Sequence, residues 1–340
     1  MSTTPPAGNP HSLRLATRGS PLARWQAERV AALLAASGVS ECELVVVSTA
    51  GDQMTEVPLA RIGGQGVFVK EVQAAVLDGR ADVAVHSAKD LPALSPDGLV
   101  LASVPERADP RDALVGATLE SLPPGALVAT GSVRRRAQLA WLRPDLTFCD
   151  LRGNMARRIE RARAAGAGVV AYAALERLGL VAEAAEVLDT ARLLPQVGQG
   201  ALALECRAGD DTTRGALAAV DDPDLHRAVR AERAFLGALG GGCTLPVGAL
   251  ARPAGVAAPT TGVAAPTTGV AVPTTGAPLA PGEDEIELDA MLASRDGHVL
   301  LRRRATGTDP DALGRALARE LLDDRGGRSL ADWTPAGGRG

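Results

Sequence analysis

The segment His86-Ser87-Ala88-Lys89-Asp90 places an acid beside a lysine, directly after a short apolar run typical of a buried strand. In open α/β sheets, ligands bind at the carboxyl ends of the strands, where such side chains lie. Asp90 could form a structural ion pair there, or it could be an ionised carboxylate that stabilises a cationic intermediate. A Ser-His-Asp triad is a weak interpretation, because residues so close in sequence do not normally stack in triad order.

Arginines are concentrated between residues 134 and 163, several of them at expected strand-to-helix turns, and Arg18 lies in an earlier turn of the same kind. Turns that carry arginine to one edge would form a receptor for several carboxylates, since each guanidinium binds a carboxylate through paired hydrogen bonds. A solvated basic helix face is the simpler interpretation, and nucleic-acid binding is another. Aromatic residues are nearly absent here, which disfavours stacking on single strands.

Cys243 follows three glycines that end a predicted helix over 222–239, so its thiol could be exposed. A free cysteine is more often a small buried residue, so the segment alone favours no function for it. The four cysteines and four histidines show no zinc-ligand spacing, and we expect no metal site.

The glycine-rich loop 63–66 precedes Phe68 and Lys70. It is not a phosphate-binding loop, because no Gly-Lys-Ser/Thr closes it. A glycine loop near a cleft is the better interpretation, and the simplest role for Phe68 is in the core.

The composition is that of a globular protein: 340 residues, 46% hydrophobic and 22% charged, with a net charge of −4. These totals indicate neither a nucleic acid nor an anionic membrane as a binding partner. The polar, proline-rich start lacks the apolar stretch of a signal peptide, and no later run approaches a membrane span, so we expect a cytoplasmic location.

Strand and helix patterns alternate twice along the chain, over 12–86 and again over 126–178, which predicts two lobes with mostly parallel α/β sheets and a cleft between them. A helix over 222–239, two antiparallel strands (285–292 and 298–304) and a helix over 309–322 predict a small α+β third domain. Inside it, a GVAAPTT-type repeat over 255–276 predicts a flexible surface loop.

Seven of these segments, in this order, resemble the porphobilinogen deaminase (hydroxymethylbilane synthase) family. They are Leu-Ala-Thr-Arg-Gly-Ser-Pro-Leu-Ala (15–23), Gly-Val-Phe-Val-Lys-Glu (66–71), His-Ser-Ala-Lys-Asp-Leu-Pro (86–92), Val-Arg-Arg-Arg-Ala-Gln-Leu (133–139), Leu-Arg-Gly-Asn (151–154), Gly-Gln-Gly-Ala (198–201) and Gly-Gly-Cys (241–243). Each segment alone is only weakly specific for the family, but the occurrence of all seven in this order is highly specific.

The resemblance implies three domains. Two α/β lobes similar to periplasmic binding proteins would span 11–105 (plus about 200–220) and 106–199. A C-terminal α+β domain with an open antiparallel sheet would span 221–333, with a flexible insert at 253–282, and would carry the cofactor.

The resemblance also implies a monomeric, cytoplasmic transferase of porphyrin and heme biosynthesis. Cys243 would hold a dipyrromethane cofactor through a thioether. Four porphobilinogen molecules would each lose ammonia and condense onto it, and hydrolysis would release the linear tetrapyrrole hydroxymethylbilane. The small-molecule substrate would be the partner, with no nucleic acid and no membrane.

By the same resemblance, Asp90 would be the catalytic carboxylate and would also contact the cofactor. The other implied cofactor contacts are Ser87, Lys89, Thr130, Ser132, Arg134, Arg135 and Arg152, and the implied substrate contacts are Arg18, Phe68, Arg158 and Gln199. Gln65 stands where many relatives have lysine, so the resemblance does not imply the contact of that lysine for this chain. An alternative from another class is a two-lobed anion-binding or sensory protein without catalysis, in which Asp90 and Cys243 would have no necessary role.

Overall fold

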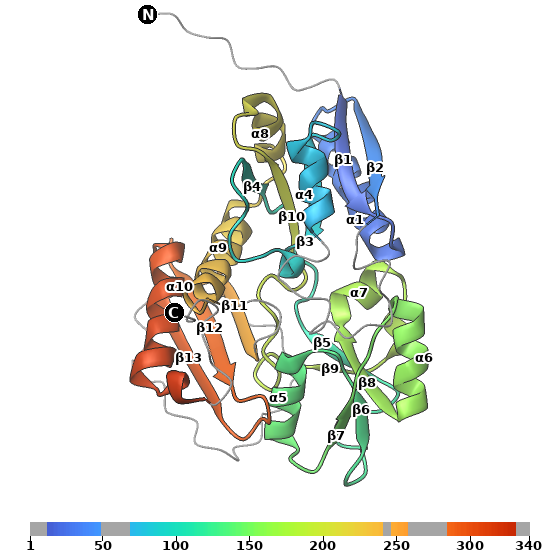
Figure 1. Ribbon diagram of the computed structural model, residues 1–340, viewed down its shortest axis with the longest axis vertical. Coiled ribbons are helices and arrows are strands. Elements are labelled where there is room, and N and C mark those ends of the chain that lie inside the picture. The colour runs from blue at the N-terminus through green and yellow to red at the C-terminus, as the bar shows by residue number, and fades with distance from the viewer. Residues whose placement is uncertain (1–11, 49–68, 241–245, 258–283, 331–340) are drawn as a thin grey trace, which may run out of the picture.

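The computed structural model describes residues 12–48, 69–240, 246–257 and 284–330, which form three packed units, each built on its own β-sheet (Figure 1). In this view the first unit lies at the top, the second at the lower right and the third at the lower left. The predicted α/β class, with two lobes and a smaller C-terminal unit, is confirmed. None of the helices in the described ranges is long and apolar enough to cross a membrane.

The first lobe is a five-stranded sheet with the order β2-β1-β3-β10-β4 and helices on both faces. Leu13 and Leu15 pack with Val30 of α1, whereas Ala16 packs with Val76 of α4 on the other face. Because both faces are covered, polar groups concentrate at the strand ends. The elements are β1 (Ser12–Arg18), α1 (Pro21–Ala36), β2 (Glu41–Val47), α4 (Lys70–Leu77), β3 (Val83–Ser87), the 3-10 turn η1 (Ala88–Asp90), β4 (Leu99–Ser103), β10 (Leu202–Arg207) and α8 (Asp211–Ala218).

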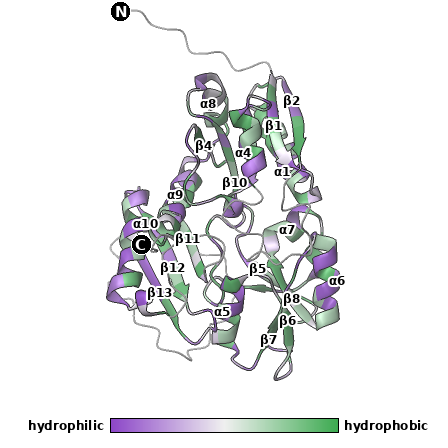
Figure 2. Ribbon diagram, in the orientation of Figure 1, coloured by the Kyte–Doolittle hydropathy of each residue, from purple (hydrophilic) through white to green (hydrophobic). Residues whose placement is uncertain are grey.

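The second lobe repeats this plan with the order β7-β6-β8-β5-β9. Leu139 of α5 packs with Leu114 and Val128 on one face, and Ala162 of α6 packs with Ala113 on the other. Figure 2 shows hydrophobic residues along these strands. The elements are β5 (Asp112–Val115), β6 (Leu127–Ala129), α5 (Val133–Leu142), β7 (Thr147–Cys149), α6 (Met155–Ala165), β8 (Ala167–Ala171), α7 (Tyr172–Arg177), η2 (Val181–Glu183) and β9 (Ala184–Leu188).

The prediction of mostly parallel sheets was wrong, because both sheets are mixed. In the first, β1 pairs in parallel with β2 and β3, whereas β10 pairs antiparallel with β3 and β4. In the second, β6 pairs in parallel with β7 and β8, whereas β5 pairs antiparallel with β8 and β9. The reason is the route of the chain, which leaves the first lobe after β4 and returns to it from the second as β10, inserted between β3 and β4.

The two segments that cross between the lobes, 104–111 and 189–201, lie against each other. The Ala108 N–H donates to the Gly200 carbonyl at 3.1 Å, and the Leu202 N–H donates to the Glu106 carbonyl at 3.0 Å. Arg107 and Ala201 form an antiparallel bridge between them. The lobes are therefore joined by a paired, hydrogen-bonded connection.

The C-terminal unit is a three-stranded antiparallel sheet in the order β11-β12-β13, with helices on one face. On the other face, Leu250 and Met291 pack against Ala137 of α5, so the third unit rests on the second lobe. The predicted domain boundaries remain predictions. The elements are α9 (Pro223–Ala238), β11 (Val247–Pro253), β12 (Ile286–Ala293), β13 (Leu300–Gly307), α10 (Pro310–Arg319), the π-helical turn η3 (Glu320–Asp324) and η4 (Gly327–Ser329).

Candidate active site

The turn that carries Lys89 and Asp90 lies at the carboxyl end of β3, a central strand of the first lobe. Ser87, the last residue of β3, accepts a hydrogen bond at its Oγ from Nε2 of the buried Gln26, at 2.7 Å. Both charged side chains therefore start from a backbone that is anchored to the sheet and to α1.

The second crossing segment presses on this turn. Gly198 has a φ of +71°, and a Cβ there would lie 2.8 Å from the carbonyl carbon of Ala88, so only glycine fits. Nε2 of Gln196 donates to the Lys89 carbonyl at 3.1 Å. The position of the turn thus depends on the connection between the lobes.

Arg134 and Arg135 share one carboxylate, that of the fully buried Asp112. Arg134 Nη1 lies 2.8 Å from Asp112 Oδ2, and Arg135 Nη2 lies 2.8 Å from Oδ1. Burial opposes ionisation of Asp112, but the two guanidinium groups outweigh it and lower its pKa to about 2. Two arginines on one carboxylate leave an excess positive charge.

These arginines lie deep in the second lobe. Arg134 is 2% exposed and donates from Nη1 to the Leu194 carbonyl at 2.6 Å, while Arg135 donates from Nη1 to the Val169 carbonyl at 3.1 Å. The Nε and Nη2 atoms of Arg134 are buried and have no hydrogen-bond partner among the described residues. An anion placed beside Arg134 would satisfy donors that are otherwise unpaired.

Thr130 and Ser132 shape the turn between β6 and α5. Ser132 caps α5, because its Oγ accepts from the Arg135 N–H at 3.4 Å, and Thr130 Oγ1 accepts from the Ser132 N–H at 3.3 Å. Both hydroxyls lie at the start of the helix that carries the paired arginines. The free N–H groups of a helix N-terminus favour an anion at this place.

Charged groups of the two lobes face each other. Burial lowers the pKa of Arg158, on α6, to about 10; the nearby cations Arg135, Arg152 and Arg18 lower it further, whereas Asp90 raises it. Arg18 and Asp90 belong to the first lobe, and such interactions are strong only at short range. The structure therefore brings together residues that are far apart in sequence.

The same charged groups act on Lys89. Burial lowers its pKa to about 8, and the pull of Asp90 is opposed by the positive charges of Arg135 and Arg158. A bound carboxylate would relieve the repulsion among these cations. The arrangement is suited to an anionic ligand that touches both lobes.

Gln199 lies apart from this surface. It is fully buried, and its Nε2 donates to the Pro110 carbonyl at 2.7 Å and to Asp112 Oδ1 at 2.8 Å. In this conformation it connects the two crossing segments and supports Asp112. Its predicted contact with substrate remains a prediction.

Cys243, Phe68 and Gln65 lie outside the described residues. Their predicted roles remain predictions.

Sequence reasoning missed Asp112, the partner of the paired arginines, and Gln196, which holds the Lys89 turn. The only local signal was an acid at the start of an apolar run, 112–115, which is also common in ordinary strands. Neither residue could be assigned without the contacts made over long sequence separations.

Two family models match the chain: "Porphobilinogen deaminase, dipyromethane cofactor binding domain" over residues 13–215, and "Porphobilinogen deaminase, C-terminal domain" over residues 226–256. The chain belongs to the porphobilinogen deaminase family. The larger match contains Ser87, Lys89, Asp90 and every candidate arginine, so the charged groups described above lie within the part of the chain that matches the family's cofactor-binding domain.

Relatives in this family cover nearly the whole chain. The porphobilinogen deaminase of Acidothermus cellulolyticus is 45% identical, covering 91% of this chain and 88% of its own, and that of Roseiflexus castenholzii is 44% identical, covering 94% and 98%. Among solved structures, the chain is also similar to the methionine binding protein MetQ, with a TM-score of 0.39 and 13% identity over 62% of this chain and 91% of that one.

Proposed function

We propose that this protein is a hydroxymethylbilane synthase, which condenses four porphobilinogen molecules with loss of ammonia and releases the linear tetrapyrrole. One observation carries the proposal beyond family membership: Lys89 of the first lobe and Arg158 of the second both interact with Asp90, and burial and neighbouring cations lower the pKa of each. Porphobilinogen carries an acetate and a propionate, so a cationic site that meets the ligand from two sides suits it.

The described residues fit the dipyrromethane cofactor of this family. Its two pyrroles carry four carboxylates, and the cations of the candidate site outnumber the acids coupled to them. The cations are Arg18, Lys89, Arg134, Arg135, Arg152 and Arg158, and the acids are Asp90, Asp112 and Asp150. The unpaired Nε and Nη2 of Arg134 point to the same need for an anion.

When bound to the Cys243 sulfur, the cofactor supplies the pyrrole carbon to which substrate units are added. Asp90 would stabilise positive charge on pyrrole nitrogens and assist proton transfer, since it is a carboxylate among the cations that bind the acidic side chains. Arg135, held by Asp112, would present its charge in a fixed position. Arg18, Arg152 and Arg158 would bind carboxylates from the two lobes, and Lys89, Thr130 and Ser132 would add polar contacts.

The proposal includes a cytoplasmic monomer that acts on this small molecule without a nucleic-acid or membrane partner. Sedimentation of the purified protein tests the monomer. A steep fall in affinity for DNA or RNA with rising salt would contradict the absence of a nucleic-acid partner.

The intact mass of the purified protein tests the assignment. We expect extra mass equal to two pyrrole units, located on the peptide that contains Cys243, and no such mass in Cys243→Ser. We also expect conversion of porphobilinogen to hydroxymethylbilane. Unmodified protein that still turned over porphobilinogen would overturn the cofactor assignment, and modified protein without turnover would overturn the proposed function.

A further inference from the structure

Helix α6 presents two exposed arginines, Arg157 and Arg161, one turn apart on the same side of the helix. Neither belongs to the candidate site described above. Both lie directly beside it, however, at the turn 152–154 that leads into the helix.

Their contacts define this position. Arg161 Nη1 donates to the Arg152 carbonyl at 3.3 Å. Arg157 lies against Gly153, where a Cβ would approach the Arg157 Cβ to 3.1 Å. The Gly153 carbonyl in turn accepts from Nε of Arg158, at 2.8 Å. The backbone of one turn thus connects two exposed arginines to two arginines of the site.

The charges of this exposed pair are not matched by carboxylates. Neither Arg157 nor Arg161 forms an ion pair with any of the described residues, although Glu160 lies on the same helix. Two positions further along, by contrast, Arg163 is paired with Glu183 at 2.5 Å. The helix therefore neutralises one exposed arginine and leaves two available to a ligand.

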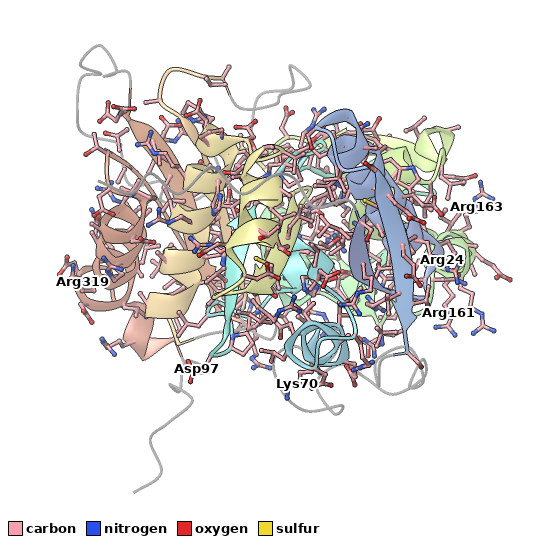
Figure 3. All side chains as sticks on the ribbon, turned by 90° about the horizontal axis from the view of Figure 1, so that it is seen from above. Arg24, Lys70, Asp97, Arg161, Arg163 and Arg319 are labelled. Carbon is pink, nitrogen blue, oxygen red and sulfur yellow. The ribbon has the colours of Figure 1, made fainter. Side chains whose placement is uncertain are left out.

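A third exposed arginine, Arg24, lies in the second turn of α1, shortly after Arg18. It too forms no ion pair with a described residue. In the view of Figure 3, Arg24 and Arg161 lie towards one edge of the molecule and Arg319 towards the other, but Arg24 belongs to the first lobe and Arg161 to the second. We call Arg157 and Arg161 the outer arginines.

The proposed reaction creates a need for such residues. Every pyrrole that is added brings two further carboxylates, while the number of cations in the candidate active site, here called the inner site, is constant. The six cations and three acids of the inner site leave an excess of three positive charges, fewer than the four carboxylates of the cofactor alone, so repulsion among carboxylates rises with each added unit. Later units require cations outside the inner site.

We propose that the outer arginines form a second carboxylate subsite, which binds the acetate and propionate groups of the pyrroles added late in elongation. This inference rests on the proposed function. The subsite contributes little to the first addition and more to the third and fourth, because only the longer chain reaches it.

The test compares Arg157→Gln/Arg161→Gln with Arg315→Gln/Arg319→Gln, a matched pair of exposed arginines one turn apart on α10. Both variants lose the same charge. The protein is mixed with porphobilinogen and the reaction is quenched at set times. Intact-mass spectrometry of each sample then counts the pyrroles that have been added covalently.

We expect the first addition to occur at the wild-type rate in both variants. In the α6 variant, the third and fourth additions should slow by about threefold to tenfold, as the loss of two exposed ion pairs would give. Short-chain complexes should then accumulate. High salt should slow late additions in the wild type more than in the variant, and Arg157→Lys/Arg161→Lys should restore most of the rate because the charges are kept.

The same distribution of complexes in the α6 variant and the α10 control would overturn the subsite. Equal slowing of all four additions would also overturn it, because that result indicates a general electrostatic attraction of the substrate to the protein or a structural defect. A wild type that acquired no pyrrole at all would contradict the proposed function itself. A wild type that elongates normally, together with a variant that elongates equally well, would contradict only the subsite.

Discussion

The carboxylate of Glu232, on α9, lies 2.7 Å from Nη1 of Arg107, in the first segment that crosses between the lobes. Glu232 is fully buried and also accepts from the Gly198 N–H at 2.6 Å and from the Ala251 N–H at 2.9 Å. One side chain therefore joins both crossing segments to the C-terminal unit. In sequence, α9 of this unit precedes Cys243 and β11 follows it. We infer that this carboxylate fixes the C-terminal unit relative to the lobes.

Glu232→Ala should lower the free energy of unfolding by about 3–5 kcal/mol, because it leaves the mostly buried guanidinium of Arg107 without its partner. Urea unfolding measures this loss. Glu232→Leu combined with Arg107→Met should cost less than the two single changes added together, since it leaves no unpaired charge. A loss below about 1 kcal/mol in Glu232→Ala would contradict the role of the pair.

Asp112 should stabilise the fold in a pH-dependent way. Its pKa is about 2 in the folded protein and 3.8 for an ordinary aspartate, so the stabilisation is complete above the unfolded pKa and is lost as the pH falls through the folded one. The linkage corresponds to about 2 kcal/mol at neutral pH. The stability difference between the wild type and Asp112→Asn should therefore shrink as the pH falls from about 5 towards 2.

Urea unfolding at several pH values measures this difference. Asp211→Asn is the control, because the Asp211 side chain is 87% exposed and should cause no comparable change. A wild-type advantage over Asp112→Asn that stayed constant down to pH 3 would contradict the ion pairing of Asp112 with Arg134 and Arg135.

Asp90→Ala should retain its fold and lose turnover by about 100-fold or more, as expected for a group that assists proton transfer and stabilises charge. Its place on a half-buried turn at the end of β3 makes a large effect on folding unexpected. Turnover of porphobilinogen and the melting temperature measure the two effects. Asp97→Ala, an exposed change in the same lobe, serves as control, and full activity in Asp90→Ala would overturn the catalytic role.

Lys89 should make cofactor loading dependent on pH. Since its pKa is lowered to about 8, it loses its charge, and with it the attraction for carboxylates, as the pH rises through that value. The rate at which cofactor-free protein acquires its two pyrroles should therefore fall above pH 8 in the wild type. Lys89→Arg should load at an undiminished rate up to higher pH, because arginine remains charged. Identical profiles in the two proteins would exclude Lys89 as a carboxylate contact.

Local sequence features predicted the places of several candidate site residues, because these residues occur where a strand meets a turn. Asp90 follows β3, and Arg134 and Arg135 follow β6, so a strand pattern and its end were enough to place them at sheet edges. The strands β5 and β10 were missed. Both are buried on both faces, so they lack the alternation that distinguishes a strand from other apolar runs.

The sequence by itself determined the α/β lobes, the order of the motifs and the family to which they belong, since periodicity and turn chemistry are encoded by neighbouring residues. Only the tertiary structure decided that β10 enters the first sheet between β3 and β4, that Asp112 holds Arg134 and Arg135, and that Glu232 joins both crossing segments. These relationships connect residues distant in sequence, and they depend on which groups must be paired once burial removes them from water.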